Sequence, residues 1–175
     1  TVAGTELRRT RLKAVGHVLD ERLRYQLGGG FSNDGDPFSL TDAWVEWRDA
    51  AGGRVRVGNF RPIFLREELT SAKRLPGVER SLVSRLVRQL RRPGVMVHAT
   101  MGDVRGHVAI QDPGAGSPGD AWRASARVEL RLAGDWRPLR QETGFPGTEA
   151  AGALGLGVLH RERTGGRDRT QATVD

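Results

Sequence analysis

Arginine is the residue type in this chain with the clearest chemistry, because it recurs at alternate positions of short segments. The plainest case is residues 122–132, where one alternate set is apolar and the other is polar or charged. The polar set is Arg123, Ser125, Arg127, Glu129 and Arg131. A guanidinium stays charged and forks onto oxyanions through paired hydrogen bonds. A row of such groups could pass a small anion from one site to the next without trapping it.

A period of two places these arginines on β-strands, since side chains alternate between the two faces of a strand. The same alternation occurs at 10–14, 22–27, 41–48 and 54–57, and further strands are predicted at 95–100, 104–111 and 153–161. We therefore predict an antiparallel meander of about eight strands between Leu7 and Arg161. One face should carry Leu12, Leu23, Val55, Val57, Val128 and Leu130, and the opposite face Arg9, Arg24, Arg56 and Arg127.

The predicted connections alternate between short turns and long loops, which is typical of up-and-down outer-membrane barrels. The connection 133–152 is an exception, because it is long but falls at the short-turn end. The longest connection, 61–92, contains an apolar pattern that predicts a helix over 78–90. This helix would either pack on an apolar surface with its basic side in solvent, or belong to a loop that folds into a lumen and narrows it.

Composition limits the classes of protein. The 175 residues carry a net charge of +7, which points to an acidic partner such as nucleic acid, anionic lipid or a small anion. The absence of cysteine excludes disulfides and thiolate metal sites. No stretch is long and apolar enough for a membrane-spanning helix, and the first residues lack the apolar region of a signal peptide. A transmembrane β-barrel stays compatible with all of this.

The sequence gives poor signals for catalysis, and we expect neither an enzyme nor a cofactor. The four histidines are scattered without metal-ligand spacing. Gly28-Gly29-Gly30 lacks the Lys-Ser/Thr that follows a phosphate-binding loop. Gly152, Gly155 and Gly157 lie in a strand-like segment, where bending or close packing explains them better.

A soluble sheet with one solvated face would show the same alternation. Three features favour a transmembrane barrel: the charges are mostly Arg, the strands follow one another without crossover helices, and tryptophans lie near strand ends, as in an aromatic girdle. Those tryptophans are Trp44, Trp47, Trp122 and Trp136. The predicted fold class is thus all-β, an antiparallel up-and-down transmembrane β-barrel with one short helix in a long loop.

Several segments resemble the phosphate-selective porin O and P family. Residues 7–12, LRRTRL, resemble the family's Arg-Arg-Ala hairpin segment, and residues 57–64, VGNFRPIF, its Gly-x-Phe-x-x-x-Phe strand end. Residues 67–73, EELTSAK, and 78–82, VERSL, resemble its Leu-Glu-x-x-Thr-Ser-Ser and Glu-Arg-x-Leu segments. Residues 154–158, LGLGV, fit a later Leu-Gly-Leu-x-Tyr strand.

The resemblance implies a sixteen-stranded outer-membrane barrel, usually trimeric, that passes phosphate along rows of Arg and Lys. Of such a barrel this chain would be an N-terminal half or fragment, a single partial porin domain over 1–175. Matched by motif, the first-strand pair is Arg8 and Arg9, the strand cation is Arg56 and the loop hydroxyl is Ser71. The chain departs from the family where Glu68 replaces a Lys and Ala72 replaces a second Ser, which leaves the choice of anion open.

Together, charge pattern and resemblance predict an outer-membrane channel for passive diffusion of small anions such as phosphate or polyphosphate. Its partners would be inorganic anions, outer-membrane lipid and two further copies of the chain in a homotrimer. We expect no binding of nucleic acid. The alternatives are a soluble basic β-domain that binds nucleic acid and a structural surface protein without a transport role. The predicted anion-binding residues are Arg8, Arg9, Arg11, Lys13, Arg24, Arg56, Arg61, Ser71, Lys73 and Arg127.

Overall fold

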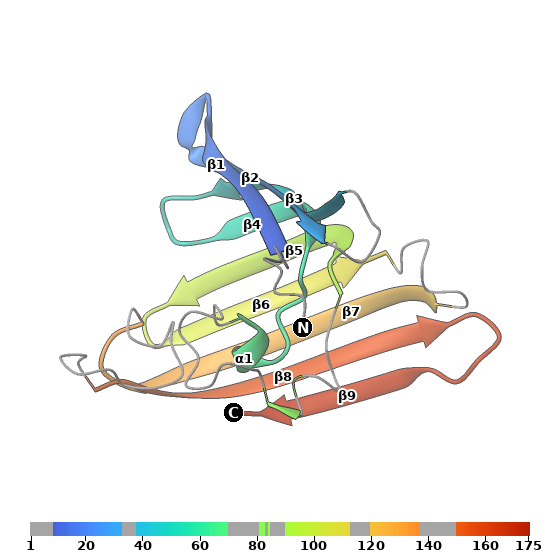
Figure 1. The fold of residues 1–175 in the computed structure, drawn as a ribbon. Coiled ribbons are helices and arrows are strands. Elements are labelled where there is room, and N and C mark those ends of the chain that lie inside the picture. Colours follow the sequence, from blue (N-terminus) through green and yellow to red (C-terminus); the bar gives the residue numbers. More distant parts are fainter. Residues whose placement is uncertain are drawn as a thin grey trace, which may run out of the picture.

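The chain forms one antiparallel sheet whose nine strands follow the order of the sequence (Figure 1). This computed structural model describes residues 9–32, 38–69, 81–82, 84, 90–112, 120–136 and 150–175. The strands are β1 (Arg9–Val18), β2 (Asp20–Ser32), β3 (Ser39–Arg48), β4 (Arg54–Phe60), β5 (Arg92–Met101), β6 (Val104–Gln111), β7 (Asp120–Ala133), β8 (Gly152–Arg163) and β9 (Arg169–Val174). One short helix, α1 (Arg66–Leu69), follows β4.

The predicted meander is confirmed, and it has one strand more than expected. The additional strand is β9, in which Ala172 and Val174 are the only apolar residues, a pattern too short to predict a strand. It forms because β8 offers it a hydrogen-bonding edge, with Val158 opposite Ala172 and Leu156 opposite Val174. The sheet does not close on itself, and among the described strands β1 and β9 are its edges.

The register places the predicted residues on the predicted faces. Leu23 lies opposite Trp47, which lies opposite Val55, so these apolar side chains share one face. Arg24 lies opposite Glu46, which lies opposite Arg56, so the charged residues share the other. We call these the apolar face and the charged face. The first carries Leu12, Leu23, Val55, Val57, Val128 and Leu130, and the second Arg24, Arg56 and Arg127; the side chain of Arg9 lies outside the described residues.

Burial is the reverse of what a soluble sheet shows, because the apolar face is exposed and the charged face is covered over much of its area. On the apolar face the exposed fraction is 62% for Leu12, 57% for Val108 and 52% for Val128. On the charged face it is 1% for Glu46 and 1% for Arg127. A band of exposed apolar side chains across many strands is what a lipid-facing wall requires.

The cover of the charged face is the chain segment that follows β4. Phe60 packs with Met96 and Ala109 in one buried cluster, and Phe64 and Leu65 pack with Leu159 in a second. Figure 1 shows α1, in green, in front of the sheet near β7 and β8. Most of the helix predicted over 78–90 lies outside the described residues; Leu82 and Ser84, which are described, are helical.

The described part of the chain contains no helix that is long and apolar enough to cross a membrane.

The prediction that four tryptophans belong to an aromatic girdle is wrong for two of them. Trp47 and Trp122 are exposed, as a girdle requires. Trp44 instead lies on the charged face beneath Arg56, whose guanidinium carbon is 4.0 Å from the ring centroid. Trp136 lies against Arg105 of the same face, at 4.4 Å. An indole ring attracts a guanidinium through its electron-rich face. Trp44 and Trp136 therefore pack against arginines of the charged face and do not lie at the membrane interface.

Candidate functional site

Two carboxylates organise the arginines of the charged face. The first is Glu46 of β3, which is buried and accepts hydrogen bonds from the arginines of its own strand and of β4. Arg48 Nε donates to Glu46 Oε1 at 2.7 Å, and Arg56 donates to Oε2 through Nε at 3.0 Å and Nη2 at 2.5 Å. One carboxylate thus holds two guanidiniums, so this cluster keeps an excess of one positive charge.

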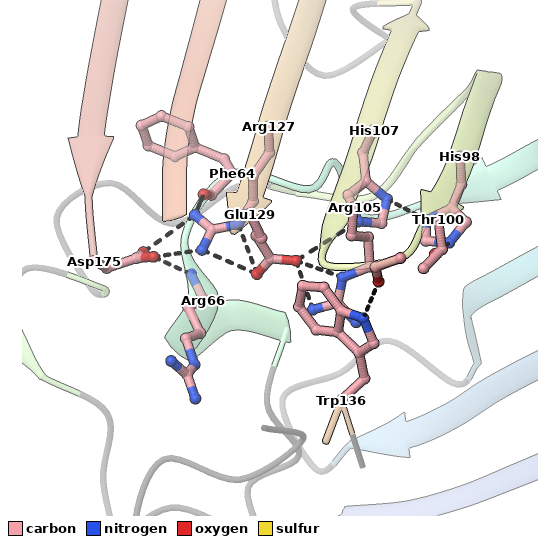
Figure 2. A network of polar contacts seen from close by, with 11 residues as sticks. Phe64, Arg66, His98, Thr100, Arg105, His107, Arg127, Glu129, Trp136 and Asp175 are labelled. Carbon is pink, nitrogen blue, oxygen red and sulfur yellow. Dashed lines mark hydrogen bonds and ion pairs between the residues drawn. The ribbon is translucent and has the colours of Figure 1, made fainter. Parts of the chain in front are cut away.

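The second carboxylate is Glu129 of β7. Arg105 Nε donates to Glu129 Oε2 at 2.6 Å, and Arg127 Nε donates to Oε1 at 3.2 Å (Figure 2). Trp136 flanks Arg105 and donates its indole N–H to the carbonyl oxygen of Gly102 at 3.2 Å. Figure 2 shows these side chains converging from β5, β6 and β7 on one network.

Arg127 is fully buried, and its donors are used within the protein. Besides Glu129 it binds the carboxylate of Asp175, and its Nη1 donates to the carbonyl oxygen of Phe64 at 2.9 Å. Two glycines of β8 make room for this arrangement. A Cβ on Gly155 would collide with the Arg127 guanidinium, and one on Gly157 would lie 2.8 Å from the Phe64 carbonyl oxygen. Of the three glycines for which bending or close packing was expected, Gly155 and Gly157 serve close packing, whereas a Cβ on Gly152 would meet nothing within 4 Å.

Both ends of the 61–92 connection are fixed to the charged face by side chains that bind main-chain carbonyls. Gln111 Nε2 donates to Phe60 O at 2.8 Å and to Arg92 O at 2.9 Å. Arg123 Nη2 donates to Leu90 O at 2.6 Å. With the Arg127–Phe64 bond, these contacts hold the described ends of this connection against the charged face, and the folding of the whole loop into a lumen stays a prediction.

Two histidines lie next to each other beside the Glu129 network. His98 and His107 are opposite each other on β5 and β6, and their Nδ1 atoms are 2.8 Å apart. His98 Nε2 lies 3.1 Å from Thr100 Oγ1 (Figure 2). A hydrogen bond between two ring nitrogens needs one lone pair, so at least one ring is neutral in this contact. No group of three or more potential metal ligands occurs in the described residues.

The predicted anion-binding residues occupy different settings. Arg11 and Lys13 are exposed on the charged face of β1, and Arg24 is half-buried opposite Glu46. Arg56 is bound to Glu46, Arg127 is buried, and Arg61 is half-buried just after β4. Arg8, Ser71 and Lys73 lie outside the described residues, as does the side chain of Arg9. Anion binding by all of these residues stays a prediction.

Arg48, Arg54 and Arg105 lie on the charged face but were not among the predicted anion-binding residues. The cross-strand register brings Arg48 opposite Arg54, and Arg105 opposite Glu129. The apolar–charged alternation of 54–57 was a usable signal for Arg54, because it places Arg54 and Arg56 on the same face.

Comparison with known families decides the class of protein. A family model described as phosphate-selective porin O and P matches residues 2–129. The chain belongs to this family. No curated protein and no solved structure matches the chain itself.

Membership of the porin family explains why the apolar face of the sheet is exposed while most of the charged face is covered. Porins of this family are outer-membrane channels and not enzymes. At the level of the family, the match supports a phosphate-selective role. In an outer-membrane barrel the apolar face contacts lipid and the polar face lines the interior. The nine-stranded open sheet, with its apolar face exposed and its charged face folded over, matches that division.

Proposed function

We propose that this chain lines part of a channel through which small anions such as phosphate or polyphosphate diffuse passively across the outer membrane. The observation that supports it best is the arginine-rich charged face opposite an exposed apolar face. On the charged face Glu46 is outnumbered by its arginine partners, while Arg11, Lys13 and Arg24 have no carboxylate partner in the described residues. The resulting positive field concentrates anions and excludes cations.

The chain would act as a single partial barrel domain over 1–175. The two edges β1 and β9 leave hydrogen-bonding groups available, and further strands pairing with them would close the wall. Outer-membrane lipid would cover the apolar face, and the closed barrel would assemble as a homotrimer. The segment 61–69, which Arg127 binds at the carbonyl oxygen of Phe64, would narrow the interior.

Two neighbouring residues of β1 provide a matched test of this function. Lys13 lies on the charged face and Leu12 on the apolar face, both exposed. In planar lipid bilayers the protein should be permeable to chloride over potassium, as measured by the reversal potential in a KCl gradient. Lys13→Glu should lower this preference by changing the lumen charge by two, whereas Leu12→Thr should leave it unchanged.

Cation selectivity of the unmodified protein, or equal effects of the two substitutions, would overturn the proposed function. The family assignment would stand, because fold and selectivity depend on different residues.

A further inference from the structure

Two histidines meet across neighbouring strands of the charged face. His98 of β5 lies directly opposite His107 of β6, and a tight turn over 102–103 joins the two strands. The Nδ1 atoms of the two rings are 2.8 Å apart. Two lone pairs at this distance repel each other, so a positive group has to lie between them. A single shared proton is the smallest group that meets this need.

The far nitrogen of each ring faces an oxygen atom, which orients Nδ1 toward the other ring. His98 Nε2 lies 3.1 Å from Thr100 Oγ1. His107 Nε2 lies 3.9 Å from Glu129 Oε2, close enough for charge attraction but longer than a hydrogen bond (Figure 2). A histidine that binds a metal ion usually donates its other ring N–H to a carboxylate or another acceptor, which fixes its tautomer and orientation. Thr100 and Glu129 occupy the positions of such acceptors.

The spacing of the two Nδ1 atoms favours one coordination geometry. With metal–nitrogen bonds of about 2.0–2.1 Å, two ligands at a right angle are about 2.9 Å apart, and two ligands of a tetrahedral ion about 3.3 Å. The observed 2.8 Å is close to the right-angled case. Right-angled nitrogen coordination is typical of Cu²⁺ and Ni²⁺. The χ2 torsion of histidine has a broad energy minimum, so small rotations turn both lone pairs toward one ion.

The charges around the pair restrict the kind of ion that it can bind. Near the two rings lie four arginines and two carboxylates, namely Arg54, Arg56, Arg105, Arg127, Glu46 and Glu129. This excess of positive charge opposes every cation. Mg²⁺ and Ca²⁺ prefer oxygen ligands, so two imidazoles offer them nothing to offset the repulsion. Cu²⁺ binds nitrogen ligands most strongly among the divalent ions of the first transition series, and it is therefore the ion best able to overcome the repulsion.

We propose that His98 and His107 form a binding site for a divalent transition-metal ion with right-angled nitrogen coordination, and that Cu²⁺ is the ion it favours. The ion would bind both Nδ1 atoms and complete its coordination with water. The shared proton would move to Nε2 of the ring that carried it, so both imidazoles stay neutral and both Nε2 atoms donate outward. The site does not depend on the proposed channel function, because it needs only the pairing of β5 with β6.

The test is calorimetric titration of the detergent-solubilised protein with CuCl₂ at neutral pH, with electron paramagnetic resonance of the bound ion. We expect one site with nitrogen ligands for which Mg²⁺ does not compete. His98→Gln and His107→Gln should each weaken Cu²⁺ binding by at least about tenfold, and Thr100→Val, which removes only the outer oxygen, by about tenfold. The matched control is His160→Gln on β8, because His160 contacts Thr170 and should not contribute.

Weaker Cu²⁺ binding in the first three variants, with the His160→Gln protein unchanged, supports the site. Unchanged affinity in His98→Gln and His107→Gln overturns it, as does a loss in His160→Gln as large as in these two. Tighter binding of Zn²⁺ than of Cu²⁺ overturns the right-angled geometry. Thr100→Val leaves both histidines in place, so it keeps the test decisive if a histidine variant does not fold. Anion selectivity is measured separately, so failure of this site and failure of the channel function are distinguishable.

Discussion

Glu46→Gln should destabilise the protein and strengthen its binding of anions at the same time. Glu46 is 1% exposed and accepts three hydrogen bonds from Arg48 and Arg56. Removing one partner of a fully buried ion pair costs about 3–5 kcal/mol. The two arginine side chains keep 30% and 23% exposure, so water compensates them in part, and we expect a loss of about 2 kcal/mol.

The same substitution removes a negative charge from the charged face beside Arg48 and Arg56. An anion bound by these guanidiniums would be repelled by the carboxylate, and two unit charges about 6 Å apart repel each other by about 3 kcal/mol at an effective dielectric constant of about 20. Solvent and salt screen part of this repulsion, so we expect the half-blocking phosphate concentration to fall by about tenfold.

Stability would be measured by denaturant unfolding in detergent micelles, followed by tryptophan fluorescence, and anion binding by phosphate block of chloride current. The control is Asp103→Asn, since Asp103 is 62% exposed and its pair with Arg131 should contribute less than about 1 kcal/mol. Equal stability losses in the two variants, or a Glu46→Gln channel that phosphate blocks less well, would refute the reasoning.

Three further predictions concern the apolar face, the covering segment and the loop. Val108→Lys, in the middle of exposed β6, should cost about 2–4 kcal/mol of stability in lipid vesicles, whereas Val104→Lys at the strand end should cost about 1 kcal/mol or less; equal costs would argue against a lipid-facing band. Gly157→Val should displace Phe64 and lower the unfolding midpoint, while Gly106→Ala, which meets nothing within 4 Å, should have little effect; an unchanged midpoint in both would contradict the packing. Glu68→Lys should strengthen phosphate block because it replaces a repelling carboxylate with a cation, and an unchanged block would separate this residue from the conduction path.

The alternation of residues such as Arg123, Ser125 and Arg127 determined much of the architecture by itself. Strands have a period of two, so the sequence alone assigned the apolar and charged faces, and the register confirms both. It did not reveal β9, because the two apolar residues Ala172 and Val174 are too weak a pattern to predict a strand, which forms here through main-chain pairing with β8.

Only the tertiary structure decided which arginines have partners. Arg56 and Arg127 look equivalent to Lys13 in the sequence, yet the first is bound to Glu46 and the second is buried beneath Phe64. Arg48 and Arg54 come together because a tight turn over 49–53 sets the register of their strands. Pairing across strands depends on register and on segments distant in the chain, and a local pattern holds no information about either.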